Sequence, residues 1–257
     1  MPSSPPVTRI ARSDATSVTV RGADLVNELI GHRTFTEMVY LLTVGRAPGP
    51  TETRVLDACL VTLMEHGFTP GALVTRITAD SVPDQVQVAM AAGLLTVGGV
   101  FVGTMEGCAT LLEEGIASDD PDTWCARTAD TYLSAKRPLP GFGHPFHKPD
   151  DPRTPRLFDV AAEAGVDGRF IALLQRLSRA VDARAGRHLT INATGAIGAL
   201  LLEIGVPASI MRAVAVISRC GGLAGHIVEE RETGSARTIW KLTEEAIPYV
   251  GDSAGGS

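Results

Sequence analysis

The sequence predicts an all-α fold. In most segments after residue 21, apolar residues recur at the spacing of three to four residues that is typical of amphipathic helices. No series of alternating strand and helix patterns is present, and no G-x-G-x-x-G run follows a predicted strand. A doubly wound dinucleotide-binding fold is therefore excluded. The sequence also lacks a Walker loop, a G-x-S-x-G run and an H-E-x-x-H run.

The expected elements follow from local patterns. Residues 16–21 alternate apolar and polar side chains, which predicts one short strand. Thr34 is a favourable N-cap and Glu37 completes a capping box, so we expect a helix from there to Gly45. The other segments with helical spacing are 23–30, 51–67, 122–135, 155–164, 168–185, 191–204 and 207–218.

Composition narrows the function classes. The chain has 257 residues, of which 44% are hydrophobic and 20% charged, as in globular proteins. A net charge of -6 and 5% aromatic residues argue against a nucleic-acid partner, which would need a basic, base-stacking surface. The four cysteines show no metal-ligand spacing, so we expect no metal site and no disulfide framework. The N-terminal residues lack an apolar core of signal-peptide length, and we expect a cytoplasmic protein.

One stretch could span a membrane by its length. Residues 83–105 carry a single charge, and Gly99 and Gly103 form a GxxxG pair. The stretch is nevertheless rich in Ala, Gly and Thr and contains two glutamines. We therefore expect two closely packed buried helices here and no membrane association.

A proline-rich segment at 137–155 interrupts the helical pattern. It could be a rigid connector, although loops on helical scaffolds are also where chemistry is concentrated. Residues 143–153, G-H-P-F-H-K-P-D-D-P-R, resemble without a gap the G-H-x-x-x-K-x-x-D-P-R signature of the citrate synthase superfamily. Residues 21–67 and 218–226 resemble two further blocks of that superfamily, and residues 93–112 resemble a third, most closely in the citryl-CoA lyases and the C-terminal module of ATP-citrate lyase. The four blocks occur in the same order as in the superfamily.

The resemblance implies a two-domain helical subunit that works as a homodimer or a higher homo-oligomer. It implies a large domain at 1–111 and 203–257, a small domain at 112–202, and an active site in the cleft between domains. The implied reaction joins or splits a carbon–carbon bond between an acyl-CoA and a 2-oxo acid, such as citryl-CoA yielding acetyl-CoA and oxaloacetate. Coenzyme A is then part of the substrate, and no covalently bound cofactor is expected. The short chain fits the citryl-CoA lyase branch better than full-length citrate synthases.

The resemblance also assigns roles to individual residues. His144 matches the catalytic histidine that contacts the oxo-acid or citryl oxygen, and the charge of an imidazole changes near neutral pH. Arg153 and Arg219 match arginines that bind substrate carboxylates, for which the planar guanidinium is suited. His66 resembles a substrate-binding histidine at the end of an early helix.

Each role has a structural alternative. His66 could be a polar helix end, and Arg219 could face solvent, although its apolar, glycine-rich surroundings favour a buried partner. His226 is better interpreted as a core histidine than as a substrate contact, and His147 as a loop residue. Lys148 borders the proline-rich loop and is a candidate for the CoA phosphates, with a solvated basic cluster as the alternative.

Two positions depart from the family pattern. Thr194 stands where the N-x-D segment of the family has its proton-abstracting aspartate, and a threonine hydroxyl is no comparable base. Phe101 stands where citrate synthases have a histidine, as it does in the lyase branch. Glu106 is the nearest carboxylate by motif position that could replace this aspartate. Alternatively, water moves the proton on the acetyl carbon, or the protein has lost the reaction and only binds CoA compounds. The sequence thus predicts a CoA-dependent carbon–carbon lyase or synthase, with a catalytically impaired CoA- and polycarboxylate-binding protein as the alternative and an unrelated helical structural protein as a third.

Overall fold

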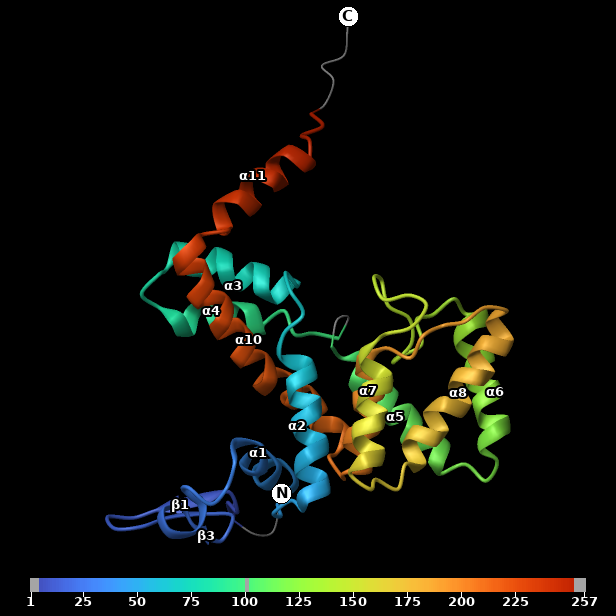
Figure 1. Cartoon of the computed structure of the whole chain (residues 1–257), viewed down its shortest axis with the longest axis horizontal. Helices are drawn as coiled ribbons and strands as arrows, with labels where there is room; N and C mark the ends of the chain where they lie inside the picture. The colour runs from blue at the N-terminus through green and yellow to red at the C-terminus, as the bar shows by residue number, and fades with distance from the viewer. Residues whose placement is uncertain (1–4, 100–101, 252–257) are drawn as a thin grey trace, which may run out of the picture. The chain divides into compact units, whose positions relative to one another are not determined.

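The chain folds mainly into helices, as the apolar spacing predicts (Figure 1). The computed structural model describes residues 5–99 and 102–251. The chain divides into two compact units: unit 1 comprises Met1–Thr62 and Gly99–Val214, and unit 2 comprises Leu63–Gly98 and Ala215–Ser257. The expected small domain at 112–202 stays a prediction.

Unit 1 opens with a small antiparallel sheet where one strand was predicted. The predicted helix at 23–30 is wrong, because residues 23 and 24 pair with the central strand instead. The Asp24 carboxylate then accepts hydrogen bonds from the N–H groups two and three residues later, and only a five-residue π-helix follows, η1 (Leu25–Leu29). The strands, in spatial order, are β1 (Ala11–Ser13), β2 (Val18–Val20) and β3 (Ala23–Asp24).

The predicted capping box is confirmed at the start of α1 (Phe35–Val44). Thr34 Oγ1 accepts the Glu37 N–H at 3.2 Å, and the Glu37 carboxylate accepts the Thr34 N–H at 2.7 Å. Gly45 ends the helix in the left-handed region at φ 90°, as a C-terminal glycine should. The next helix is α2 (Pro50–Met64), which begins one residue before and ends three residues before the predicted bounds.

The core of unit 1 surrounds α9 (Ala193–Glu203), which packs against α5, α7 and α8. Ile197, Leu200 and Leu201 are completely buried. A Cβ at Gly198 would lie 2.9 Å from the Met105 carbonyl oxygen, so glycine is what lets α5 and α9 approach this closely. Figure 1 shows α6 beside α8, against which it packs. The bounds are α5 (Thr104–Ile116), α6 (Pro121–Ser134), α7 (Arg153–Glu163) and α8 (Arg169–Ala185).

Unit 2 contains two helices that the sequence analysis did not predict, α3 (Pro70–Ser81) and α11 (Ala236–Ala246). Of the two helices expected within 83–105, α4 (Val86–Leu94) is present and packs against α3; Val100 and Phe101 lie outside the described residues, and α5 begins only at residue 104. A Cβ at Gly93 would lie 2.8 Å from the Gly71 carbonyl oxygen, which explains the small residues. In the described parts of the chain, no helix has both the length and the apolar character needed to cross a membrane.

The helix expected at 207–218 is much longer than predicted. A single 3₁₀ turn, η2 (Ala208–Ile210), leads into α10 (Met211–Thr233), which continues through three glycines. Glycine in a helix costs about 1 kcal/mol relative to alanine. Gly222 offsets this cost through packing, because a Cβ there would collide with the Met64 carbonyl group at the end of α2. Local helix propensity could not predict that α10 continues past residue 218, because this packing contact between Gly222 and Met64 depends on the tertiary fold.

The glycine contacts predict opposite effects for two helix substitutions. We expect Gly198→Ala to destabilise the protein by about 1–3 kcal/mol, because the added methyl overpacks the α5–α9 contact. Gly225→Ala in α10 is the matched control: nothing lies within 4 Å of its Cβ position, so helix propensity should stabilise the protein by up to about 1 kcal/mol. Urea unfolding measures both, and equal stability of Gly198→Ala and the wild type would refute the packing argument.

Candidate active site

The loop that carries His144 is fixed to the start of α9 by a short antiparallel bridge between Phe142 and Ile191. Gly141 begins this bridge in the left-handed region at φ 87°, and a Cβ there would lie 2.7 Å from the Cys108 sulfur. The loop therefore approaches α5 and α9 at a point that only glycine permits, and its position is set by backbone contacts within unit 1.

The amide side chain of Asn192 joins this loop to α9. Its Nδ2 donates to the Gly143 carbonyl oxygen at 2.8 Å, directly before His144. Its Oδ1 caps α9 by accepting the Gly195 N–H at 3.0 Å, and it also accepts the Thr194 hydroxyl at 2.7 Å. One side chain therefore fixes both the backbone beside the predicted catalytic histidine and the threonine at the aspartate position.

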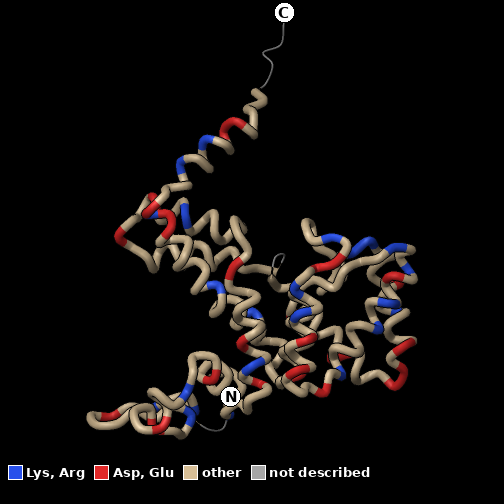
Figure 2. Tube along the Cα trace, in the orientation of Figure 1, with Lys and Arg blue, Asp and Glu red and all other residues tan. Residues whose placement is uncertain are grey.

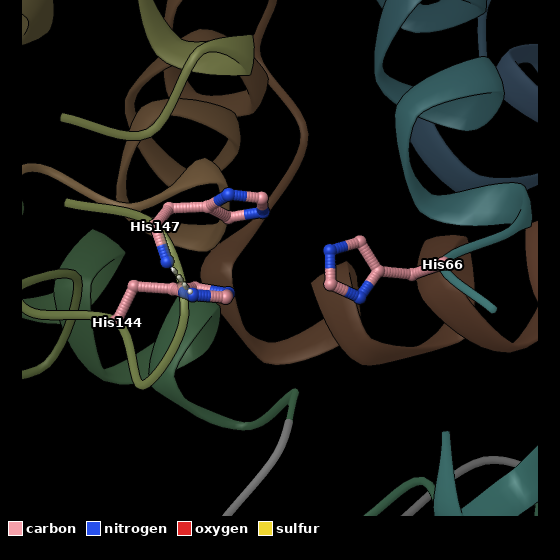
Figure 3. A group of neighbouring side chains, drawn as sticks. All are labelled: His66, His144 and His147. Carbon is pink, nitrogen blue, oxygen red and sulfur yellow. Dashed lines mark hydrogen bonds between the residues drawn. The ribbon is translucent and has the colours of Figure 1, made fainter. Parts of the chain in front are cut away.

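The imidazole of His144 is held in one tautomer. Its Nδ1 accepts the backbone N–H groups of Phe146 at 3.1 Å and His147 at 3.0 Å, the second of which is drawn in Figure 3. A nitrogen that accepts hydrogen bonds carries no proton, so the neutral ring carries its proton on Nε2. The rings of His144 and His147 lie 4.3 Å apart between centroids. The third residue in Figure 3, His66, belongs to unit 2.

Arg153, the first residue of α7, is paired with Asp151. Its Nε and Nη2 donate to the two carboxylate oxygens of Asp151 at 2.9 and 2.8 Å. Asp151 is completely buried and also accepts the N–H of Ala193, at the positive end of the α9 dipole, at 2.9 Å. The pair uses two of the five N–H groups of the guanidinium, and the Arg153 side chain is 27% exposed, so donors remain for a substrate carboxylate.

These contacts set the charge of Asp151. Burial alone would raise the pKa of its carboxyl, but the hydrogen bonds from Arg153 and from the Ala193 N–H outweigh burial and lower the pKa to about 2. The carboxylate therefore stays ionised throughout the physiological pH range, and Arg153 keeps its partner.

Thr194 and Glu106, the two candidates for the missing base, have different surroundings. The Thr194 hydroxyl donates to Asn192, so at the 2.8 Å contact with the Thr104 hydroxyl it is the acceptor. Glu106 lies two residues after Thr104 on α5, and residues at this spacing point to different sides of a helix. Its carboxylate pairs with Arg212 at 2.5 Å and lines a pocket of about 490 Å³ beside η2. The described contacts thus place Glu106 and Thr194 in separate environments.

Lys148 is exposed on the same loop. Figure 2 shows Lys and Arg gathered where α6 and α8 both end, together with some Asp and Glu, of which Asp130 pairs with Arg184 and Asp182 with His188. Lys136 and Arg137 follow α6, and Arg137 lies over the Tyr132 ring, 4.8 Å from its centroid. The loop therefore begins beside a basic end of unit 1.

His66 and Arg219 both contact one residue of unit 2, Glu65. The Glu65 carboxylate accepts the His66 N–H at 2.8 Å and lies 3.7 Å from Nη1 of Arg219, while the exposed His66 side chain follows the end of α2. Arg219 lies in α10 and is 16% exposed. The convergence of these two residues with His144 on one substrate stays a prediction.

His226 is a buried histidine with partners at both nitrogens. Its Nδ1 accepts Nε–H of Arg76 at 2.8 Å, and its Nε2 lies 3.1 Å from the Glu65 carboxylate. This geometry fits the interpretation as a core histidine. Arg76 is 1% exposed and also pairs with Glu229 and Glu230.

A family comparison identifies the architecture that carries these residues. The model for "Citrate synthase, C-terminal domain" matches residues 44–242. The chain belongs to the citrate synthase family. The superfamily predicted from the loop motif is thereby confirmed, as is the mainly helical fold.

Individual members of the citrate synthase family are similar over different lengths. The structure of citryl-CoA lyase from Hydrogenobacter thermophilus superposes with a TM-score of 0.87 at 29% identity, covering 98% of this chain and 96% of that one. The citrate synthase of Synechocystis sp. is 26% identical over 219 residues, which is 83% of this chain and 52% of that protein. The 2-methylcitrate synthase 2 of Corynebacterium glutamicum is 27% identical over 194 residues, 74% of this chain and 49% of that protein. The chain spans about half the length of the curated relatives it matches.

The residues that contact the candidate site residues carried little or no signal in the sequence. Asp151 had the appearance of a turn residue before proline, and Asn192 had a visible signal only as a helix cap. Arg76 and Glu65 had no signal at all, because their partners on α10 lie 150 or more residues away in sequence. Contacts of this kind depend on the tertiary fold.

The lowered pKa of Asp151 predicts that the free energy of unfolding falls at acidic pH. Because its folded-state pKa is depressed, its contribution is complete well above the unfolded pKa of 3.8 and is lost as pH falls through about 2. We expect the wild type to lose about 2 kcal/mol between pH 6 and pH 2 from this group alone. The variant Asp151→Asn should lack this component, which urea unfolding at several pH values would measure. Parallel pH profiles of the two proteins would contradict the assignment.

Proposed function

We propose that this member of the citrate synthase family is a CoA-dependent carbon–carbon lyase or synthase acting on citryl-CoA or a similar acyl-CoA and 2-oxo acid pair. The observation that carries the proposal is the segment at 143–153, in which the neutral His144 ring carries its proton on Nε2 and Arg153 is paired with an ionised Asp151. The similarity to a citryl-CoA lyase over nearly the full length of both chains supports the cleavage reaction. The similarity to citrate and 2-methylcitrate synthases supports the same bond chemistry.

Cleavage of citryl-CoA breaks the bond between the carbinol carbon and the CH₂ group next to the thioester. The hydroxyl gives its proton to water and its oxygen becomes the carbonyl oxygen of oxaloacetate, while the electron pair of the broken bond forms the enolate of the thioester. A proton returned from water or Glu106 to that CH₂ carbon gives acetyl-CoA, so the overall reaction neither releases nor consumes a proton. Charge therefore develops on the carbinol oxygen, and the Nε2–H of His144 would donate a hydrogen bond to it.

The remaining charges of the substrate need cationic partners. In the proposal, Arg153 and Arg219 bind carboxylates, and His66 adds a hydrogen bond. Arg153 is oriented before substrate arrives, because Asp151 holds its guanidinium in a bidentate pair. Lys148 and the basic end of α6 and α8 are proposed to bind the phosphates of CoA.

A second candidate follows from Thr194. Its hydroxyl is already hydrogen-bonded to Asn192 and Thr104, and it replaces the carboxylate that would move the proton on the acetyl carbon. A protein with this substitution could bind CoA compounds and polycarboxylates without turning them over. If it is active, we propose that water or Glu106 handles this proton. A homodimer and a cytoplasmic location also stay predictions.

Replacing His144 tests the proposed activity. We expect His144→Ala to lower kcat for citryl-CoA cleavage by about 10²–10³, the usual cost of removing one donor to a developing oxyanion. Oxaloacetate release, coupled to malate dehydrogenase and NADH oxidation, measures the rate. His32→Ala is the matched control, because His32 is an exposed histidine of the same unit. Equal rates for wild type and His144→Ala, across several acyl-CoAs and 2-oxo acids, would exclude the activity.

Restoring the carboxylate separates the two candidates. If the wild type is a slow enzyme, Thr194→Asp should raise kcat by about 10²-fold or more, because general acid–base groups contribute 10²–10⁴. Thr194→Val, which removes the hydroxyl without adding a base, is the control. An unchanged, undetectable rate in Thr194→Asp together with retained CoA binding by calorimetry would favour the binding protein.

A further inference from the structure

Glu65 is the point where the polar groups of unit 2 meet. One carboxylate oxygen accepts the backbone N–H of His66 at 2.8 Å. The other lies 3.1 Å from Nε2 of His226 and 3.7 Å from Nη1 of Arg219. Two residues assigned to the substrate, His66 and Arg219, therefore contact the same carboxylate, which has no assigned role of its own.

His226 can offer Glu65 only a donor. Its Nδ1 accepts the Nε–H of Arg76 at 2.8 Å, so the proton of the neutral ring is on Nε2, which faces Glu65. Arg76 has no freedom to change this arrangement. It is 1% exposed, its Nη1 donates to Glu230 at 3.1 Å, and its guanidinium lies 4.9 Å from the centroid of the Phe68 ring.

The charge of Glu65 follows from these neighbours. Burial would raise the pKa of its carboxyl, but the His66 N–H and the contact with His226 outweigh burial and hold the pKa below its ordinary value. An anionic group thus stands beside an arginine that is proposed to bind an anion. Such a group attracts the guanidinium and therefore favours one orientation of it before substrate binds.

We infer that Glu65 is a positioning residue, which orients Arg219 for a substrate carboxylate. This inference rests on the proposed function, since it concerns the same substrate. Glu65 acts through Arg219, and its removal should therefore have little further effect once Arg219 is gone.

A double-mutant cycle in the full chain tests this dependence. The proteins are the wild type, Glu65→Ala, Arg219→Ala and the double variant, with Glu245→Ala as a control at an exposed glutamate of α11. The readouts are KM for citryl-CoA, Kd for oxaloacetate by calorimetry, and Tm. We expect Glu65→Ala alone to raise KM and Kd about tenfold, the usual scale for a residue that orients a ligand-binding group. In the Arg219→Ala background the same change should cost less than about threefold. Glu245→Ala should match the wild type.

Each outcome has a defined meaning. If Glu65→Ala leaves a binding-competent protein unaffected, or if its effect is equally large without Arg219, the inference is wrong while the proposed function stands. If the wild type binds oxaloacetate without turnover, the cycle measured in Kd still tests the inference, and only the lyase proposal fails. If the wild type neither binds nor turns over any of the compounds, both are overturned. Should Glu65→Ala lower Tm strongly, Glu65→Asp, which keeps the charge on a shorter side chain, should recover stability and part of the affinity.

Discussion

The candidate site of unit 1 depends on one buried charge, the Asp151 carboxylate. A buried carboxylate without partners costs several kcal/mol, so this charge requires its donors to be in place whenever the unit is folded. Those donors come from Arg153 at the start of α7 and from Ala193 at the start of α9. The pairing therefore joins two helices and the loop of His144 before any substrate arrives. If this site is catalytic, such preorganisation lowers the activation free energy, because the groups are already oriented before the reaction begins.

The hydroxyl of Thr194 has a consequence for both directions of the proposed reaction. A catalyst lowers the same barrier for cleavage and for condensation, because both pass through one transition state. Replacing the carboxylate by a hydroxyl therefore slows cleavage and formation of the carbon–carbon bond by the same factor. The direction of net reaction is then set by the concentrations of the acyl-CoA and the oxo acid. What the substitution can change is the identity of the group that moves the proton on the acetyl carbon.

Local sequence signals correctly predicted the features that depend on interactions between neighbouring residues, such as helix caps. The capping box of Thr34 and Glu37 and the Gly45 terminus of α1 were confirmed, because they depend on neighbouring residues only. The helix expected at 23–30 failed because strand pairing, a tertiary contact, outweighed its apolar spacing. The length of α10 was missed because the glycines after residue 218 weaken local helix propensity, and the packing role of Gly222 depends on its tertiary contact with the end of α2.

The candidate site residues also fall into two groups, those that a local motif could indicate and those that only the tertiary structure shows. The motif at 143–153 located His144 and Arg153 through a resemblance, since chemistry constrains their spacing along one loop. Glu65 and Arg76 belong to no local pattern, and their partners come from α10, far along the chain. Candidate residues within one loop motif could therefore be named from the sequence, whereas residues whose contacts come from distant parts of the chain could not. The roles of all these residues stay predictions until variants are measured.

Each unit pairs an arginine assigned to the substrate with a carboxylate of the chain, but the two pairs differ in strength. Asp151 is buried and holds Arg153 through two bonds below 3 Å, so a substrate carboxylate cannot displace it and must use the remaining N–H groups. Glu65 is 43% exposed and lies 3.7 Å from Arg219. An ion pair at this distance is weaker than a bidentate hydrogen-bonded pair, although the Arg219 side chain is only 16% exposed. Arg153 is thus suited to impose an orientation on the substrate, and Arg219 to adapt to it.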